Sequence, residues 1–158
     1  MAEERALIIR AYRDEDFVAV CAVHDRARPD ELRGSCDPRA FVPLAQEQED
    51  LASFQRSAKY VACQGDLIAG FMGVDGEYIS WLYVDPDFYG HGIGRRLLRL
   101  AVQLAGPGAW TIALVGNTRA LGLYESEGFA IGRTFEGENA GYPCTAARLT
   151  LHPEAPAR

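Results

Sequence analysis

The stretch YGHGIGRRLL, residues 89–98, holds glycine at three alternate positions directly before a run with helical apolar spacing. Bare backbone permits the close approach of a ligand. A helix start exposes unpaired N–H groups and the positive end of the helix dipole, which together bind anions. Arg95 and Arg96 would each be disfavoured there by roughly 0.3–1 kcal/mol unless an anion were bound. The stretch therefore predicts a phosphate-binding loop, with a flexible turn and solvated arginines as the alternative.

The sequence of this stretch does not match either of two common phosphate-binding motifs. A GxGxxG dinucleotide loop that began at Gly90 or Gly92 would need glycine at position 95 or 97, where the chain has Arg95 and Leu97. A Walker A loop would need Gly-Lys followed by Ser or Thr, which the sequence lacks. A dinucleotide-binding or nucleoside-triphosphate-binding protein is therefore disfavoured.

Hydrophobic periodicity and turn residues predict the elements that must position this loop. Alternating patterns predict strands over residues 6–11, 59–64, 67–74, 77–84, 110–115, 129–135 and 142–151. Helical spacing predicts helices from residue 17, over 44–56, over 94–105 and over 117–127, with an irregular stretch over 29–43. The loop thus lies between the fourth strand and the third helix of one domain, residues 1–158, whose tail 152–158 is expected to fray.

Composition and charge limit the class of protein. The 158 residues are 48% hydrophobic and 24% charged, which is typical of one folded domain. A net charge of −6 without a basic block disfavours nucleic acid as a partner. The apolar runs are too short for a membrane span, and the acidic N-terminus does not resemble a signal peptide, so we expect a cytoplasmic protein without a membrane partner. No CxxC pair occurs, so we expect no metal site and four reduced, mostly buried cysteines, namely Cys21, Cys36, Cys63 and Cys144.

Residues 77–129 resemble the core of the GNAT superfamily of N-acetyltransferases. Gly92 and Gly94 match the glycines of the family's acetyl-CoA loop, Q/R-x-x-G-x-G/A, although Tyr89 stands where Gln or Arg is usual. The downstream pattern N-x-x-A-x-x-x-Y-x-x-x-G-F is matched by Asn117, Ala120, Tyr124, Gly128 and Phe129. Two motifs in the right order and at the usual separation are more specific than either motif alone.

The resemblance implies both a fold and a cofactor. The fold is α/β (α+β), with a central, mixed but mostly antiparallel sheet of about seven strands, about four flanking helices and a V-shaped splay between the fourth and fifth strands. The pantetheine arm of acetyl-CoA would enter the splay and the pyrophosphate would meet the loop. The implied cofactor-binding residues are Tyr83, Val84, Tyr89, Gly90, His91, Gly92, Ile93, Gly94, Arg95, Asn117 and Tyr124.

The resemblance also implies direct acetyl transfer to a primary amine. Tyr124 would act as general acid for the departing thiolate, because a phenol of pKa about 10 is protonated at neutral pH. A buried aromatic that anchors its helix is the alternative. Glu77, at the start of the fourth strand, is the candidate base, although a solvated hairpin residue is the commoner role for a glutamate there. A non-catalytic acyl-CoA-binding regulatory domain on the same fold remains the alternative function.

The acceptor pocket has weaker signals. Residues 135–142 are expected to form a loop in which Glu136, Glu138 and Tyr142 could receive a cationic amine, or could simply lie in an exposed turn. His24 lies near the apolar side of the first helix and is expected to be a satisfied, structural histidine. The acceptor stays open between small-molecule amines, amino acids, antibiotics, peptide N-termini and protein lysines. Exposed last strands could pair in a homodimer.

Overall fold

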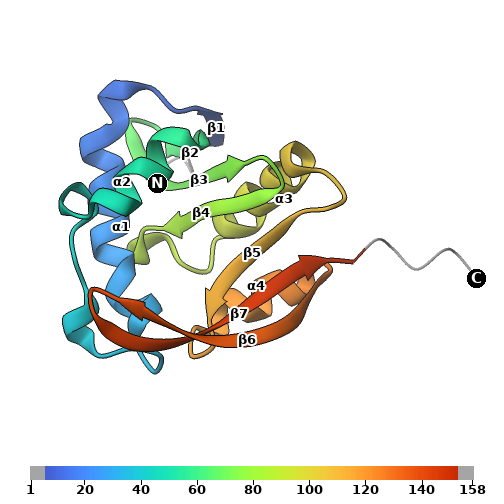
Figure 1. Cartoon of the computed structure of the whole chain (residues 1–158). Helices are drawn as coiled ribbons and strands as arrows, with labels where there is room; N and C mark the ends of the chain where they lie inside the picture. Colours follow the sequence, from blue (N-terminus) through green and yellow to red (C-terminus); the bar gives the residue numbers. More distant parts are fainter. Residues whose placement is uncertain (1–5, 153–158) are drawn as a thin grey trace, which may run out of the picture.

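The computed structural model describes residues 6–152 and contains one seven-stranded mixed sheet in the order β1-β2-β3-β4-β5-β7-β6 (Figure 1). Its strands are β1 (Leu7–Ala11), β2 (Ala58–Gln64), β3 (Leu67–Asp75), β4 (Tyr78–Val84), β5 (Trp110–Leu114), β6 (Phe129–Asn139) and β7 (Tyr142–Leu151). The helices are α1 (Phe17–Leu32), α2 (Gln48–Arg56), α3 (Ile93–Ala105) and α4 (Thr118–Ser126). The expected strand number, helix number and mixed sheet are confirmed.

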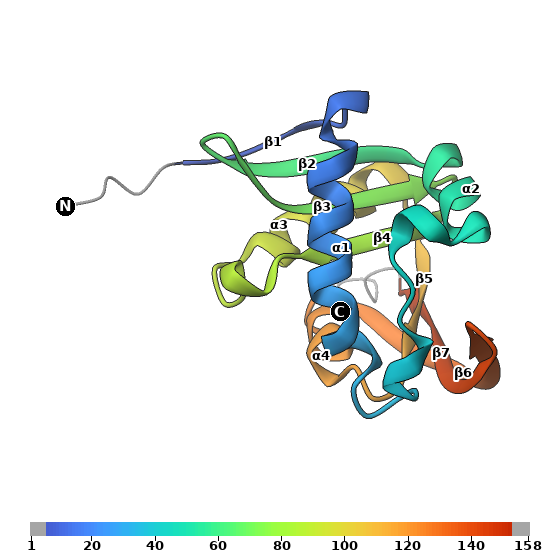
Figure 2. The same ribbon diagram turned by 90° about the vertical axis from the view of Figure 1, so that its left-hand side faces the viewer.

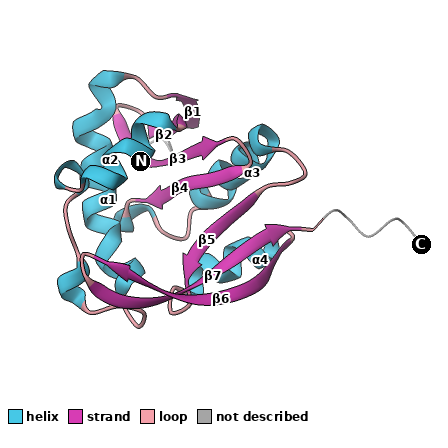
Figure 3. Ribbon diagram, in the orientation of Figure 1, coloured by secondary structure: helices cyan, strands magenta, loops and turns pink. Residues whose placement is uncertain are grey.

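The helices cover both faces of the sheet. α1 and α2 lie on one face and α3 and α4 on the other, as the turned view and the colouring by element make plain (Figures 2 and 3). The apolar side of α3 packs on β3 and β4 through Leu97, Leu98 and Ala101, all inaccessible to solvent. On the other face, Val20 and Val23 of α1 pack with aromatic side chains of the sheet. Within residues 6–152, no helix is both long enough and apolar enough to span a bilayer.

The sheet divides between β4 and β5. These strands run parallel but pair only where Tyr78 faces Trp110, and they diverge beyond this point (Figure 1). The aromatic rings of the two residues stack with centroids 4.3 Å apart, which fixes the closed end of the splay. The expected V-shaped opening is confirmed.

Two elements extend further than the sequence predicts. α1 continues through Pro29 to Leu32, since its last turn buries Leu32 against Leu114 and Ala146. This burial outweighs the helix-breaking tendency of proline. β6 continues to residue 139 rather than 135, and only a two-residue turn separates it from β7. The expected loop over residues 135–142 is therefore wrong.

The prediction that all four cysteines are reduced is also wrong. Cys36, in the segment after α1, and Cys144 of β7 form a disulfide with a Cα–Cα distance of 5.0 Å. Cys21 and Cys63 are free. The disulfide ties the segment after α1 to the last hairpin, and Cys144 borders the cleft in the splay.

Candidate active site

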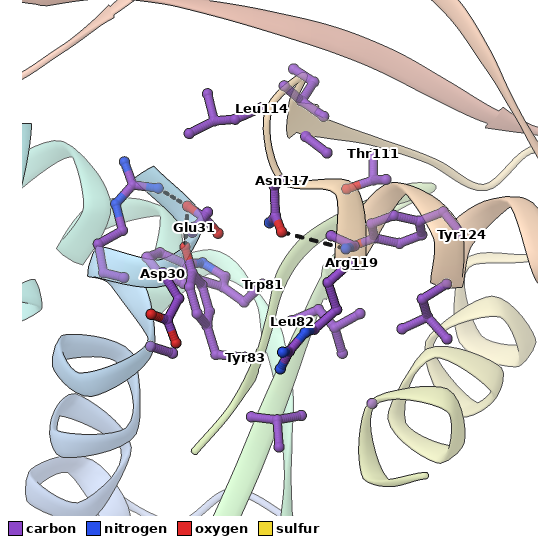
Figure 4. Close-up of a pocket in the computed structure, with 18 of the residues that line it drawn as sticks. Asp30, Glu31, Trp81, Leu82, Tyr83, Thr111, Leu114, Asn117, Arg119 and Tyr124 are labelled. Carbon is purple, nitrogen blue, oxygen red and sulfur yellow. Dashed lines mark hydrogen bonds and ion pairs between the residues drawn. The ribbon is translucent and has the colours of Figure 1, made fainter. Parts of the chain in front are cut away.

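A cleft of about 1330 Å³ occupies the splay between β4 and β5. Its lining comes from α1, α2, β4, the glycine loop, β5, the start of α4 and the last hairpin. Figure 4 shows Tyr124 and Thr111 on one side of this cleft, with Trp81, Tyr83 and Glu31 on the other. Asn117 lies between them. A single cleft therefore joins the two motifs that the sequence places apart.

The main chain of β4 has free hydrogen-bonding groups beside the cleft. Asp85 N–H donates to the Ala69 carbonyl at 2.8 Å, so by alternation Tyr83 also turns its main chain toward β3. Leu82 and Val84 consequently direct their N–H and C=O groups toward the gap, where β5 has already diverged. The main chain of Val84 thus faces the gap, as its predicted role with pantetheine requires, whereas that of Tyr83 faces β3 and that of Leu82 faces the gap.

A β-bulge at Ser80 determines which residues of β4 direct their main chain toward the gap. The β3–β4 register shifts between Gly73 and Val74, so that Ser80 has no cross-strand partner. Before the bulge, the Ile79 carbonyl faces β5 and accepts from the Thr111 hydroxyl at 2.8 Å. Beyond the bulge, the even-numbered residues face the gap instead. The bulge therefore exposes β4 donors at the place where β5 leaves.

The glycine loop leads directly into α3. Gly90 and Gly92 have φ of 81° and 76°, values that favour glycine. The first α-helical hydrogen bond of α3 runs from Arg96 N–H to the Gly92 carbonyl, so the amides of residues 93–95 have no partner within the helix. Gly94 differs, because an added Cβ would make only ordinary contacts, the nearest at 3.4 Å. Two of the three glycines are therefore required by backbone conformation.

The side chain of Arg95, at the start of α3, already contacts a carboxylate of the chain. Arg95 donates to Ser126 Oγ at 2.9 Å and forms an ion pair with Glu127 at the end of α4. Arg99 pairs with the same carboxylate at 3.1 Å. Hydrogen bonding from Arg99, with further contributions from Arg95, lowers the pKa of Glu127. The anion that offsets dipole repulsion of Arg95 is thus this glutamate, so Arg95 does not need phosphate for that purpose. Arg96 donates to the Leu7 carbonyl at 3.4 Å.

A different arginine lies at the mouth of the cleft. The guanidinium carbon of Arg119 is 3.8 Å from the centroid of the Tyr89 ring. The Tyr89 hydroxyl donates to Asp30 Oδ2 at 3.2 Å, and burial, followed by the charge of Asp30, raises the pKa of Tyr89 to about 12. The Tyr89 side chain is uncharged, but its ring holds the Arg119 guanidinium beside the glycine loop. No sequence signal singled out Arg119.

Asn117 and Tyr124 line the cleft from α4, as their seven-residue spacing indicates. Asn117 is the N-cap, and its Oδ1 accepts from Ala120 N–H at 3.4 Å. Tyr124 is 6% exposed and packs edge-on against Phe129. Burial raises the pKa of Tyr124 to about 12, while the Thr111 hydroxyl opposes the rise. The phenol is therefore a neutral donor at physiological pH.

Several predicted site residues lie elsewhere. Glu77 is exposed in the turn before β4 and packs against Gly108, outside the cleft lining. Glu136 lies on the outer face of the last hairpin, where it accepts from Thr145 at 2.7 Å, and Glu138 shares that face by alternation although it borders the cleft. Tyr142 packs on the Arg39 guanidinium. His91 is exposed in the glycine loop. The structure does not bring the predicted base and acceptor residues together.

The end of the cleft beneath α1 and α2 contains Glu31, Arg28 and Asp50, which the sequence did not single out, together with His24, which the sequence predicts to be structural. Glu31 accepts from the Tyr83 hydroxyl at 3.0 Å and pairs with Arg28. Arg28 also donates to Asn139 of β6 at 3.0 Å. His24 and Asp50 complete this end of the lining. A helical residue's direction toward a cleft depends on how its helix crosses the sheet, which periodicity alone does not reveal.

Comparison with known proteins agrees with this geometry. Residues 55–131 match the family model of the acetyltransferase (GNAT) domain. Over 74 residues the chain is 40% identical to the peptidyl-lysine N-acetyltransferase YjaB of Salmonella typhimurium, a match that covers 47% of this chain and 50% of that protein. The chain thus spans about half the length of this curated relative.

Solved structures extend the likeness to nearly the whole chain. Apo-form YjaB from Escherichia coli is 27% identical, with a TM-score of 0.70 over 92% of this chain and 97% of that one. The acetyltransferase YncA of Salmonella typhimurium, solved with its cofactor acetyl-CoA, is 18% identical, with a TM-score of 0.66 over 97% and 98% of the two chains. The latter likeness is one of fold.

Proposed function

We propose that this chain, which belongs to the GNAT superfamily of acetyltransferases, transfers the acetyl group of acetyl-CoA directly to a primary amine. The observation that carries the proposal is the opening between β4 and β5, where unpaired β4 amides, the α3 N-terminus and the Tyr124 hydroxyl all meet one cleft. The residues present fit acetyl-CoA. Amide-bearing β4 suits an extended pantetheine, and the α3 N-terminus suits a pyrophosphate.

In this proposal, the main chain of β4 positions the thioester. Leu82 and Val84 offer donors and acceptors on the edge that β5 leaves unpaired. One of these N–H groups would also donate to the carbonyl oxygen as it becomes negative during attack. Such a preorganised donor stabilises the transition state more than the ground state. The proposal needs no acyl-enzyme, since the amine can reach the thioester from the side of α1 and α2.

Tyr124 would stabilise the leaving group as a hydrogen-bond donor. With its pKa near 12, full proton transfer to a thiolate of pKa about 8.5 would be uphill by roughly 5 kcal/mol. A short hydrogen bond to the departing sulfur stabilises it without complete proton transfer and so avoids this cost. The role is therefore one of donation in the transition state rather than complete protonation, and the thiolate takes its proton from water.

The acceptor we propose is the side-chain amine of a lysine in a peptide or protein. The name of the Salmonella relative supports this choice, as does Asp50, a carboxylate in the cleft lining that forms no ion pair with a described residue. The −6 net charge of the chain also favours a cationic substrate. Cytoplasmic location and homodimerisation remain predictions. Among the strands described, β1 and β6 form the two sheet edges where a second copy could pair.

Thiol release from acetyl-CoA, measured with a panel of amines and mass detection of the product, tests the function. The panel contains a lysine peptide, an N-terminally free peptide without lysine, free lysine and an aminoglycoside. We expect thiol release and a 42-dalton gain at lysine in the first case, the mass of an added acetyl group. Cofactor binding without turnover of any amine would favour the regulatory alternative.

A further inference from the structure

His24 is a buried side chain whose second ring nitrogen is free. The residue is 2% exposed yet lines the cleft. Its Nδ1 lies 2.9 Å from Asp25 Oδ1, and that oxygen also accepts from Leu44 N–H at 3.0 Å. A carboxylate can only accept, so Nδ1 carries the proton and Nε2 keeps its lone pair. No described residue forms a hydrogen bond with Nε2. Every fully buried side-chain nitrogen or oxygen among the described residues has a partner, so Nε2 is not fully buried and opens onto the cleft that His24 lines.

We propose that His24 is the base that accepts the proton of the attacking amine, with Asp25 as its positioning residue and Asp50 as the charge that stabilises its protonated form. This inference rests on the proposed function. It places the general base at His24 rather than at Glu77, the candidate from the sequence.

The surroundings of His24 keep the ring in place and neutral. The edges of Trp81 and Tyr83, from β4, pack against it with centroids 5.9 and 5.0 Å away. Burial lowers the pKa of His24, while Asp25, and more weakly Asp50 from α2, oppose this effect and Arg28 adds to it. The imidazole is therefore neutral at pH 7 and able to accept a proton.

Asp50 is suited to respond when that proton arrives. It lines the same end of the cleft, from the first turn of α2. Burial raises its pKa, while the charge of Arg28 opposes this rise, as would a protonated His24. No described residue forms a hydrogen bond or ion pair with its carboxylate. By contrast, Asp30 is engaged by Tyr89 and Arg33, and Glu31 by Tyr83 and Arg28. Asp50 is thus the carboxylate beside His24 that remains available to an incoming positive charge.

The proposed step balances as follows. The nitrogen of the neutral amine forms a bond to the carbonyl carbon of the thioester. The C–S bond breaks and its electron pair leaves on sulfur. One N–H proton passes to Nε2 of His24 and later to water, and the thiolate takes a proton from water. A base of modest strength suffices, because the amine becomes much more acidic as its nitrogen bonds to carbon.

The test compares His24→Gln with His152→Gln, a matched change at an exposed histidine beyond the end of β7. We expect His24→Gln to lower kcat/KM by about 10²–10³-fold, in the range typical of general-base catalysis, and to leave acetyl-CoA affinity within twofold. His152→Gln should match the unmodified protein. Free imidazole should partly restore activity to His24→Ala.

The pH profile separates a base from a structural residue. Because burial lowers the pKa of His24 below the ordinary value of a histidine, the ring is neutral at pH 7, and kcat/KM should fall only as pH drops through this lowered pKa. Asp50→Asn should move that limb to lower pH, because the imidazolium loses a stabilising charge. If His24→Gln keeps both the unmodified rate and the limb, the proposal is overturned.

If His24→Gln does not fold, NMR titration of His24 in the unmodified protein replaces it. Its pKa should equal that of the kinetic limb, and a mismatch overturns the proposal. Failure of the unmodified protein to acetylate any amine refutes the proposed function instead, so the two failures are distinguishable.

Discussion

Arg119 stacks on Tyr89 with its guanidinium carbon 3.8 Å from the ring centroid, which places a positive charge at the mouth of the cleft beside the glycine loop. Tyr89 occupies the position where the family usually has Gln or Arg. In the proposed function, Arg119 would be the polar partner for phosphate that the chain lacks at position 89. Because the ring's hydroxyl is held by Asp30, the cation, the aromatic platform and α1 form one connected unit.

Arg119→Gln is expected to weaken acetyl-CoA binding by about tenfold and to raise its KM with little change in kcat. The reason is the loss of a charge-assisted contact to phosphate, worth roughly 1–2 kcal/mol. Isothermal titration with acetyl-CoA at two salt concentrations measures the effect, since the difference should shrink at high salt. Arg148→Gln is the matched control, because Arg148 also stacks on an aromatic ring, that of Trp110, at 4.1 Å. Equal affinities of the Arg119→Gln variant and the unmodified protein would contradict the assignment.

Tyr124→Phe is expected to lower kcat by about 10–100-fold while acetyl-CoA affinity stays within twofold. The ring still packs on Phe129, so only the donor to the departing sulfur is lost. Since the pKa of Tyr124 is about 12, its ionisation should produce no basic limb below pH 10 in the unmodified protein. Single-turnover kinetics from pH 6 to 10 measure both effects. A variant with unchanged chemistry would leave Tyr124 as an anchor for α4.

Gly92→Ala and Gly122→Ala should have opposite effects on stability. Gly92 has a φ of 76°, so alanine there is strained by roughly 1–2 kcal/mol although no atom would clash. Gly122 is inside α4 with open space around it, and alanine should stabilise that helix by about 0.8–1 kcal/mol. Urea denaturation of each variant measures the free energy of unfolding. Destabilisation by Gly122→Ala, or none by Gly92→Ala, would contradict the backbone assignments.

Reduction of the Cys36–Cys144 disulfide should lower the free energy of unfolding by roughly 2–5 kcal/mol. The bond closes a chain separation of 108 residues, and such cross-links restrict the unfolded chain strongly. Denaturation with and without reductant measures the change, with Cys36→Ser as the genetic equivalent. Cys21→Ser, at a free cysteine, should retain the sensitivity to reductant. Free thiols at all four positions in the purified protein would contradict the pairing.

The individual strands and helices, whose residues are close together in the sequence, could be predicted best. The fourth strand was expected over 77–84 and the third helix over 94–105, and they occur at Tyr78–Val84 and Ile93–Ala105. Period and turn residues determine such local elements. The spacing within the downstream motif also predicts that Asn117 and Tyr124 line one cleft, because residues seven apart share a helix face.

Features that join distant segments could not be predicted. The Cys36–Cys144 bond depends on how α1 ends against β7, and the Arg119–Tyr89 stack depends on the start of α4 meeting the glycine loop across the splay. The sequence predicts a satisfied His24, and the residue is buried and hydrogen-bonded to Asp25, but an apolar helix face does not show that its ring also borders a cleft. The sequence also could not show that Glu127 lies beside Arg95.

The central claim is acetyl transfer in the β4–β5 cleft, and mass detection of the product tests it most directly. The full chain, incubated with acetyl-CoA and a lysine peptide, should release thiol and add one acetyl group at the lysine side chain, at a rate reduced by Tyr124→Phe. Absence of acetyl-CoA binding, or thiol release that does not depend on any amine, would contradict the account.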